Sequence, residues 1–591
     1  MAATTASQPT LAFHGRPAAL RTVSRPGTVV APPATASRPS AASTSSSRTH
    51  QQPHERLTSL DAGFYALESA RAPMHLGWAA AFNRPPHAPS FEAIRAHIGS
   101  RLGRAPRYRQ RLLEVPFGLA EPVWVDDENF DVSRHVRRAF EDDLGELVDR
   151  VMSVPLDRDR PLWELWIAER LADGRLGVVG KAHHALVDGV AAVELMALLL
   201  DATPALEPEV PQEWRPSKTP GARDLARSAL RDRAAQTVTA SRQALNVVRE
   251  RGGLPDHAHQ VLRCMRAIGH AAVPPAPPSP LNGRTAHARH LAWSSRPLGD
   301  LEAVERRFGA TINDILLAAS AGAVRELLLA HHEDAERLKA MVPVSVRASG
   351  ERWGNRIAFL FPPLPCGEPD AVRRLSAVHE AMCARKRVHE AEAVDVVLRT
   401  LGRAPRLLRT LGARLITSPR LSNVTISNVP GPKVPLYLLG CRAEEAYPVV
   451  PLAAGHGISI GMTSLDGLAC FGVYADGTRA AEADRLAVAI GEEIDELVQR
   501  GKDAASPEGT RSQVPSADPR LTQSTRPGRP HRRNAARGQR RRATATKHDI
   551  VKLTALALLL RVLTLPSYAL RAMRALPSVV AAVDVWPPGR Q

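Results

Sequence analysis

Apolar and polar residues follow short periodic patterns in two long stretches of the chain, and each stretch predicts a mixture of strands and helices. The first stretch covers residues 57–207 and the second covers residues 289–500. Between them, residues 208–288 combine proline clusters with an Arg- and Ala-rich helical pattern at 222–250. The chain is therefore expected to fold as two α/β lobes that are joined by a long helical crossover.

The second stretch predicts the most clearly bounded elements. Helices are expected at 298–308 and at 313–329. Strands are expected at 341–346, 357–361, 422–427, 457–464 and 469–475. The last two strands flank Asp466-Gly467, a pair that suits the tight turn of a hairpin.

The two ends of the chain differ from these stretches in composition. Residues 1–56 are rich in Ala, Ser, Thr, Pro and Arg, and residues 501–549 are rich in Pro, Ser and Arg, so both predict disorder. The first segment also fits a transit peptide, and both interpretations stay open. Residues 550–591 hold an apolar, Arg-spaced segment that favours an amphipathic helix in a lipid interface. The chain has no uncharged apolar run of 18 residues, so no transmembrane helix is expected.

The net charge of +18 belongs to the ends of the chain. The first 54 residues carry five basic and no acidic residues, and residues 501–591 carry 17 basic and five acidic ones, which leaves about +1 for the rest. A nearly neutral body argues against specific nucleic-acid binding. The five cysteines form no CxxC pair, which indicates reduced thiols and a cytoplasmic protein. No zinc site is expected.

The strongest chemical signal is the sequence Lys-Ala-His-His-Ala-Leu-Val-Asp-Gly at residues 181–189. It follows a strand-like run at 176–182 and precedes an apolar helical run, so a short loop can turn His184 toward a cavity. Asp188 would brace this loop and Gly189 would permit a tight approach to the helix. A histidine can take a proton from an alcohol near neutral pH. Two alternatives are a purely structural pair of histidines and a metal site, although a third ligand is missing for zinc.

The motif His183-His184-x-x-x-Asp188-Gly189 resembles the signature of coenzyme-A-dependent acyltransferases of the chloramphenicol acetyltransferase and condensation-domain type. Further motifs between residues 57 and 498 resemble, in the same order, the bacterial wax ester synthase/diacylglycerol acyltransferase family. They are Ser59-Leu60-Asp61, Pro73-Met74-His75, Pro161-Leu162-Trp163-Glu164, Gly309-Ala310-Thr311-Ile312-Asn313-Asp314, Pro343-Val344-Ser345-Val346-Arg347, Gly354-Asn355-Arg356 and Ser427-Asn428-Val429-Pro430-Gly431-Pro432.

This resemblance implies an α/β (α+β) fold of two chloramphenicol acetyltransferase-like lobes, with mixed sheets flanked by helices. It implies an O-acyltransferase that esterifies diacylglycerol, to give triacylglycerol, or a long-chain fatty alcohol, to give a wax ester. Long-chain acyl-coenzyme A is then the co-substrate, with no cofactor and no metal. By the same resemblance His184 is the general base of a direct transfer, His183 is its neighbour, and Asp188 is a structural orienter.

The resemblance assigns less definite roles to three other motifs. Pro161, Leu162, Trp163 and Glu164 are implied to shape the acyl or alcohol site. For Asn313 and Asp314, a helix cap and a place in the substrate site stay equally open. Ser427, Asn428, Pro430 and Gly431 form either a simple turn or a cavity wall that fixes the lobe geometry.

Other functions remain as alternatives. One is a condensation-type enzyme that acts on another hydroxyl acceptor, and another is a non-catalytic protein of the lipid-droplet surface. The sequence Gly457-Ile458-Ser459-Ile460-Gly461 matches the nucleophile elbow of serine hydrolases, but the strand pattern continues beyond it, so no elbow is expected. The protein is expected to be cytoplasmic and peripheral on the inner membrane or on lipid droplets, docked through its basic C-terminal region.

Overall fold

The computed structural model describes residues 55–186, 199–204, 214–249, 274–333, 338–345, 357–387, 391, 394 and 406–504. Several expectations lie outside the described residues and stay predictions: those for Asp188, Gly189, Val346, Arg347, residues 354–356 and both ends of the chain. Within the described part, no helix is both long enough and apolar enough to cross a membrane.

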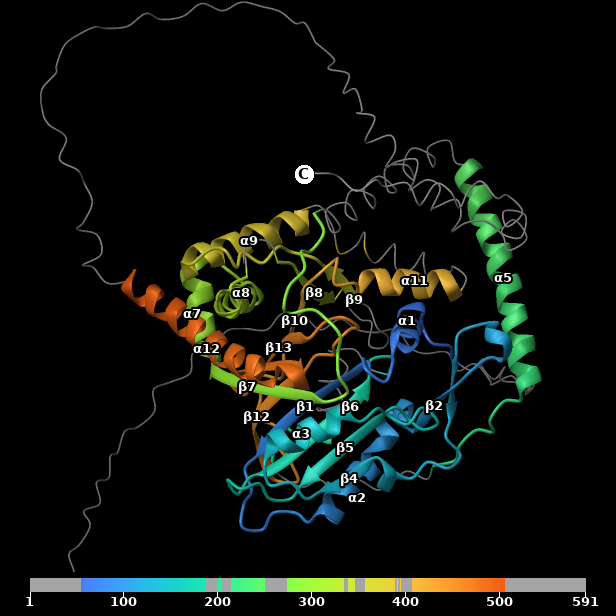
Figure 1. Ribbon diagram of the computed structural model, residues 1–591. Coiled ribbons are helices and arrows are strands. Elements are labelled where there is room, and N and C mark those ends of the chain that lie inside the picture. Colours follow the sequence, from blue (N-terminus) through green and yellow to red (C-terminus); the bar gives the residue numbers. More distant parts are fainter. Residues whose placement is uncertain are drawn as a thin grey trace, which may run out of the picture. The chain divides into compact units, whose positions relative to one another are not determined.

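The first sheet has six strands in the order β11-β12-β1-β6-β5-β4 (Figure 1). Their bounds are β1 His75–Phe82, β4 Val136–Ala139, β5 Trp163–Ala168, β6 Leu176–His183, β11 Tyr437–Leu438 and β12 Cys441–Val449. Strands β4 and β5 are parallel, while the other neighbours run antiparallel. The sheet is therefore mixed, as expected.

Strand β1 is buried on both of its faces. Trp78, Ala80 and Phe82 lie in one core cluster together with helix α2 (Phe91–Arg101). Ala79 and Ala81 lie in another cluster with helix α3 (Leu144–Ser153). Because side chains alternate across a strand, this run of apolar residues fills the space under both helices.

The second sheet also has six strands, in the order β7-β14-β13-β10-β8-β9. Their bounds are β7 Arg289–Pro297, β8 Ala340–Ser345, β9 Ile357–Leu360, β10 Val424–Val429, β13 Ile458–Leu465 and β14 Leu468–Asp476. Four helices pack on one face: α7 (Leu298–Phe308), α8 (Ile312–Ala330), α9 (Ala371–Arg387) and α12 (Ala480–Asp503) (Figure 1). The other face, with Leu291, Cys470 and Tyr474, shares a core cluster with strands β1 and β6 and helix α3.

Backbone atoms of the two sheets come close where the end of β12 lies on β13 and β14. The Ser459 hydroxyl donates to the Val450 carbonyl at 2.7 Å. A Cβ atom on Gly472 would lie 2.2 Å from the Pro448 carbonyl oxygen, so only glycine fits there. This close approach fixes the distance between the sheets.

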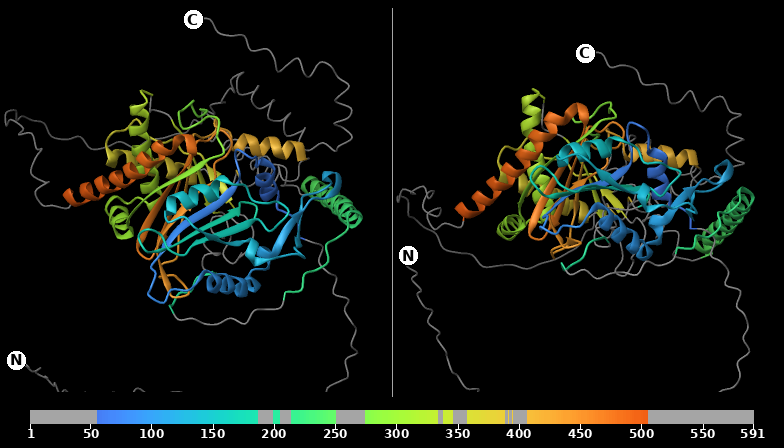
Figure 2. Two further views of the ribbon diagram at one scale, coloured as in Figure 1. Left: turned by 60° about the horizontal axis from the view of Figure 1, so that its bottom comes forward. Right: turned by 90° about the horizontal axis from the view of Figure 1, so that it is seen from below.

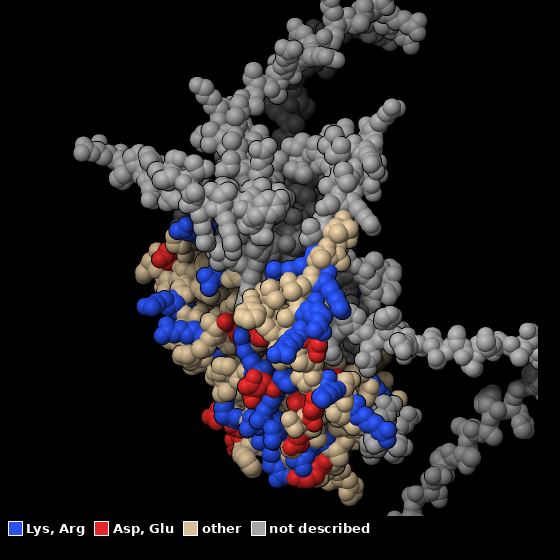
Figure 3. Space-filling view, turned by 90° about the vertical axis from the view of Figure 1, so that its right-hand side faces the viewer, with Lys and Arg blue, Asp and Glu red and all other residues tan. Residues whose placement is uncertain are grey.

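Helix α5 (Ala222–Arg249) lies in the crossover between the two stretches. Leu225 and Ala229 pack on the small sheet of β2 (Gln110–Leu113) and β3 (Val123–Asp126). Figure 2 shows the helix at the edge of the folded body in both views. Figure 3 faces this side and shows acidic as well as basic side chains on the described surface, in keeping with the balanced charge of the body.

The expected elements of the second stretch agree closely with the structure. The strands expected at 457–464 and 469–475 are β13 and β14, and Leu465 pairs with Leu468 across the turn. Asp466 and Gly467 both adopt positive φ values, 45° and 83°, as a tight hairpin turn requires. The sequence did not predict that residues 437–449, which follow β10, join the first sheet as β11 and β12.

We expect Gly472→Ala to lower the free energy of unfolding by about 1–3 kcal/mol, because the added methyl group meets a backbone carbonyl that cannot rotate away. Gly299→Ala is the matched control, since a Cβ at Gly299 in helix α7 has no neighbour within 4 Å. Thermal unfolding of both variants checks the prediction. Equal melting temperatures for the two variants would show that the sheets can separate at this point without cost.

Candidate active site

Strand β6 leads directly into the two histidines of the central motif, which lie at the end of an interior strand of the first sheet. The strand is buried along its whole length, and His183 is its last residue. The His183 N–H donates to the Leu162 carbonyl at 3.0 Å, and the His184 N–H donates to the Met74 carbonyl at 2.8 Å. These hydrogen bonds to the backbone on both sides of β6 therefore fix the Cα positions from which the two imidazole side chains extend.

Helix α1 (Ser59–Leu67) covers these histidines. It begins at the Ser59-Leu60-Asp61 motif, where the Thr58 hydroxyl accepts from the Asp61 N–H at 3.2 Å and donates to its carboxylate at 2.6 Å. Phe64 and Glu68, four residues apart, lie on one side of this helix and its C-terminal cap. Phe64 contacts His184, and Glu68 contacts His183.

The His184 imidazole is stacked on the Phe64 ring, with 3.9 Å between the ring centroids and 23° between the planes. His184 is only 9% exposed. Burial lowers the pKa of His184 to about 4, because the charged imidazolium loses its hydration there. The side chain is therefore neutral at physiological pH and can accept a proton.

His183 is held in one tautomer by its neighbours. Its Nδ1 accepts from the Ala185 N–H at 2.9 Å, so the ring proton lies on Nε2. Nε2 is 3.6 Å from Oε2 of Glu68. With one nitrogen used as an acceptor and the other directed at a carboxylate, His183 is placed to support the loop rather than to exchange protons.

Glu68 is the centre of a charged cluster, and its own side chain is 8% exposed. Its carboxylate lies 3.4 Å from Nε2 of His75, and Nε of Arg158 donates to it at 2.7 Å. Burial alone would raise the pKa of the Glu68 carboxyl, but the adjacent His183, His75 and Arg158 side chains outweigh this and hold that pKa far below its ordinary range. Glu68 is therefore a permanent anion beside His183.

His75 faces His183 directly across the antiparallel pair β1 and β6. Its Nε2 also lies 3.4 Å from the Leu156 N–H, and burial lowers the pKa of His75 to about 4. Sequence reasoning quoted His75 only as part of a motif and missed Phe64, Glu68 and Arg158. The helical spacing of Phe64 and Glu68 after the Ser59-Leu60-Asp61 motif is the signal that could have indicated them.

The Pro161 to Glu164 motif lies beside the histidines, but most of its side chains are engaged elsewhere. The Trp163 indole N–H donates to the Tyr108 carbonyl at 2.8 Å, and its ring is stacked on His135. Glu164 lies 3.2 Å from the ammonium of Lys181, which also donates to two backbone carbonyls. The Leu162 carbonyl accepts from the His183 N–H, so the motif positions β6 through its backbone.

The Asn313-Asp314 pair lies in the first turn of helix α8. Thr311 is the N-cap, and the Asp314 carboxylate accepts from the Thr311 N–H at 3.0 Å, which completes a capping box. Asp314 is buried and contacts His379 of helix α9 at 2.9 Å, while Asn313 is half-buried. The capping role of this motif thus rests on Asp314 together with Thr311.

The Ser427 to Gly431 motif covers the end of β10 and the turn after it. Ser427 and Asn428 pair in register with Gly461 and Met462 of β13. The Gly431 N–H donates to the Ser464 hydroxyl at 3.1 Å, and a Cβ there would lie 1.8 Å from the Ser464 carbonyl oxygen. Gly431 is therefore needed for this close approach, while Pro430 belongs to the same turn.

The match to a serine nucleophile elbow is excluded by the structure. Gly457-Ile458-Ser459-Ile460-Gly461 enters the continuous strand β13, which runs on to Leu465. Ser459 is 1% exposed and its hydroxyl donates to a backbone carbonyl. An elbow requires a sharp turn into a helix after the serine, so this serine is structural.

An apolar cluster joins the histidine site to the second stretch of the chain. Phe64 and Met74 pack with Met341 of β8, Phe359 of β9 and Phe361. Helix α11 (Arg406–Ile416) adds Ile416 and contacts α1 through Ala413 (Figure 1). In the described part of the chain, no group of three or more His, Cys, Asp or Glu side chains could hold a metal ion.

Two family models match the chain: the wax ester synthase/diacylglycerol acyltransferase catalytic domain at residues 57–316, and the C-terminal domain of the same family at residues 353–498. A probable diacylglycerol O-acyltransferase of Mycobacterium tuberculosis, tgs1, is 33% identical over 461 residues, which cover 76% of this chain and 96% of the relative. A putative diacylglycerol O-acyltransferase of the same organism is 31% identical over 483 residues, with 78% and 93% covered.

Among solved structures, the chain is similar to the wax ester synthase/diacylglycerol acyltransferase from Marinobacter aquaeolei VT8. The TM-score is 0.53 at 26% sequence identity, and the match covers 76% of this chain and 100% of the other. The family models cover most of the described body, and the relatives match over nearly their whole length. The chain therefore belongs to the wax ester synthase/diacylglycerol acyltransferase family.

Proposed function

We propose that this acyltransferase transfers a long-chain acyl group from acyl-coenzyme A to the hydroxyl of diacylglycerol, and less readily to a long-chain alcohol, with His184 as the general base. The observation that carries the role of His184 is its buried imidazole, which is stacked on Phe64. The curated relatives, which are named for diacylglycerol, favour the acceptor.

The reaction needs one proton acceptor and no covalent intermediate on the enzyme. The neutral imidazole of His184 takes the hydroxyl proton as the acceptor oxygen attacks the thioester carbonyl, and a tetrahedral oxyanion forms. When the carbonyl forms again, the bond to sulfur breaks and coenzyme A leaves as a thiolate. A thiol with a pKa of about 8.5 needs little acid assistance, and the imidazolium can return its proton to this thiolate.

The division of roles between the two histidines follows from their partners. Nδ1 of His183 accepts from the Ala185 N–H, and its Nε2 lies 3.6 Å from the Glu68 carboxylate. The His184 ring is stacked on the uncharged aromatic ring of Phe64. These contacts support His184 as the base and His183 as the residue that orders the loop.

The apolar cluster of Phe64, Met74, Met341, Phe359 and Phe361 supports a site for the acyl chain next to His184. Such a chain is apolar along its length, so burying it against these side chains is favourable at about 25 cal/mol per Å² of apolar surface. Because Phe64 belongs both to this cluster and to the stack with His184, a chain bound there would end near the base.

Docking on lipid surfaces is a further part of the proposal and rests on the sequence of the C-terminal region. Six arginines lie within residues 532–542, ahead of the apolar stretch 551–585. Each basic residue near an anionic surface contributes about 1 kcal/mol at low salt. Both acceptors are membrane lipids, so docking would bring the enzyme to its substrate.

We expect His184→Ala to lower turnover by about 10²–10⁴-fold, the usual loss for a general base, with little change in melting temperature. His183→Ala should lower turnover less but should lower the melting temperature, because it leaves the buried Glu68 carboxylate with one partner fewer.

The assay offers palmitoyl-coenzyme A with diacylglycerol and hexadecanol side by side and quantifies both esters. Triacylglycerol should be the main product of the unchanged enzyme. An active His184→Ala enzyme would refute the base assignment, and a wax ester as the main product would refute the acceptor assignment alone.

The low pKa of His184 predicts an unusual pH profile. Since burial lowers this pKa to about 4, the imidazole stays neutral as pH falls from 8 to about 5.5, and kcat/KM for the acceptor should be constant over that range. A histidine with the ordinary pKa of about 6.5 would instead give a fall near that pH. Initial rates in constant-ionic-strength buffers decide between the two, and a halved rate near pH 6.5 would contradict the effect of burial.

Deletion of residues 505–591 should abolish flotation with anionic liposomes at low salt and should leave turnover on dispersed substrate unchanged. Helix α12 ends at Asp503, so this truncation removes no described element. A neutral phosphatidylcholine liposome is the control for charge. Equal recovery of the full and truncated chains with anionic liposomes would rule out docking through this region without affecting the catalytic proposal.

A further inference from the structure

A second group of chemically capable side chains lies in the helical layer over the second sheet, apart from the histidine motif. It consists of Asp314 in helix α8 and of His379 and Cys383, which lie four residues apart on helix α9. Nδ1 of His379 is 2.9 Å from Oδ2 of Asp314, and Nε2 of the same ring is 3.5 Å from Sγ of Cys383. The three groups thus form a Cys-His-Asp chain.

The buried carboxylate sets the orientation and tautomer of His379. Asp314 is 2% exposed, and its Oδ1 has no hydrogen-bond partner among the described residues. An ionised carboxylate only accepts, so Nδ1 of His379 carries the ring proton and Nε2 presents its lone pair to the thiol. In this arrangement the carboxylate stabilises an imidazolium, and the imidazole can accept the thiol proton.

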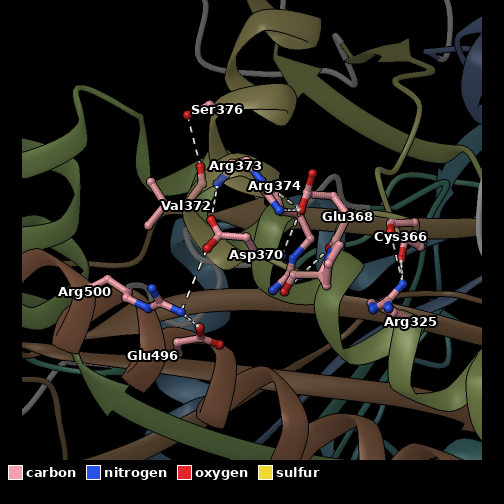
Figure 4. Close-up of polar contacts among 12 residues, drawn as sticks. Arg325, Cys366, Glu368, Asp370, Val372, Arg373, Arg374, Ser376, Glu496 and Arg500 are labelled. Carbon is pink, nitrogen blue, oxygen red and sulfur yellow. Dashed lines mark hydrogen bonds and ion pairs between the residues drawn. The ribbon is translucent and has the colours of Figure 1, made fainter. Parts of the chain in front are cut away.

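The position of helix α9 is fixed by a polar network at its N-terminal end, in which Arg374 is buried (Figure 4). Arg374 donates to the Ala318 carbonyl of α8 at 3.1 Å and to the Glu368 carbonyl at 2.8 Å, and it is paired with Glu493 of α12. The Asp370 carboxylate accepts from the Arg373 N–H at 2.9 Å. Because Ala318 and Asp314 are one turn apart on α8, the same anchoring holds His379 against Asp314.

Cys383 differs from the other described cysteines in its surroundings. Cys366, Cys441 and Cys470 are buried. Burial raises the pKa of Cys366 to about 12 and that of Cys470 to about 11, and it raises the pKa of Cys441 as well. Cys383 is only partly buried, and the His379 side chain beside it is 38% exposed. Within the described residues, Cys383 alone combines access from solvent with a neighbouring base.

We propose that Cys383 is a thiol–disulfide exchange site that takes up a low-molecular-weight disulfide, with His379 as its proton acceptor and Asp314 as the positioning residue. The thiol proton passes to Nε2 of His379, and the Cys383 thiolate attacks one sulfur of the small disulfide. The sulfur–sulfur bond of that molecule breaks as a mixed disulfide forms on the chain. The second half leaves as a thiolate and takes the proton from His379.

The test compares rates of glutathione attachment in the full chain. Reduced protein is incubated with oxidised glutathione at pH 7.5 without oxygen, free thiols are blocked with N-ethylmaleimide, and each cysteine peptide is quantified by mass spectrometry. We expect Cys383 to react about tenfold faster in the unchanged protein than in His379→Gln, which keeps the size and polarity of the ring but is not a base. Cys366, Cys441 and Cys470 serve as internal references that stay unmodified.

A second measurement needs no substitution, so it tests the proposal even if the His379→Gln protein fails to fold. In the native chain Cys383 should react faster than in the same chain unfolded in urea, whereas buried Cys366 should react faster after unfolding. An equal Cys383 rate in the native and urea-unfolded chain would overturn the proposal. So would an equal rate in a folded His379→Gln protein, because either result would show a thiol without help from its neighbours.

Discussion

The pairing of strand β1 on both of its sides holds the candidate site together. On one side β1 pairs with β6, which places His75 opposite His183 and brings the backbone of Met74 to the N–H of His184. On the other side β1 pairs with β12, which comes from the second stretch of the chain. A central strand has all of its backbone groups engaged, so its register cannot slip without moving every side chain to the opposite face. The positions of the histidines follow from this register.

Burial disfavours the charged form of both His184 and Glu68, but their neighbours lead to opposite outcomes. His184 loses hydration beside an aromatic ring, which favours its neutral form. Glu68 is also buried, but three cationic or N–H-bearing neighbours stabilise its charge. The site therefore keeps a neutral base and a fixed anion within one small volume, separated by His183. Such a separation lets the anion order the loop without drawing protons to the base.

Much of this arrangement could be predicted from the sequence because it depends on local patterns. The hairpin at Asp466-Gly467 follows from turn chemistry, and the helix that begins after Thr311 follows from its capping residues. The histidine motif could be recognised because a strand-like pattern and an apolar helical pattern flank it in the sequence. Glu68 could not be assigned in the same way, since its partners His75, Arg158 and His183 come from three separate segments. The choice of β12 as the neighbour of β1 likewise depends on contacts across more than 350 residues, which no local pattern encodes.

The place of β12 in the first sheet has a consequence for the order in which the protein can fold during synthesis. The segment with β1, β6, β5 and β4 is complete once residue 183 has been made, but the neighbour of β1 on its other side is residues 441–449. Until that segment leaves the ribosome, β1 has an unpaired edge with apolar side chains on both faces. Exposed edges of this kind pair readily with other chains. The nascent first half is therefore expected to expose this edge, and a gene fragment that ends before residue 441 is expected to yield an aggregation-prone product.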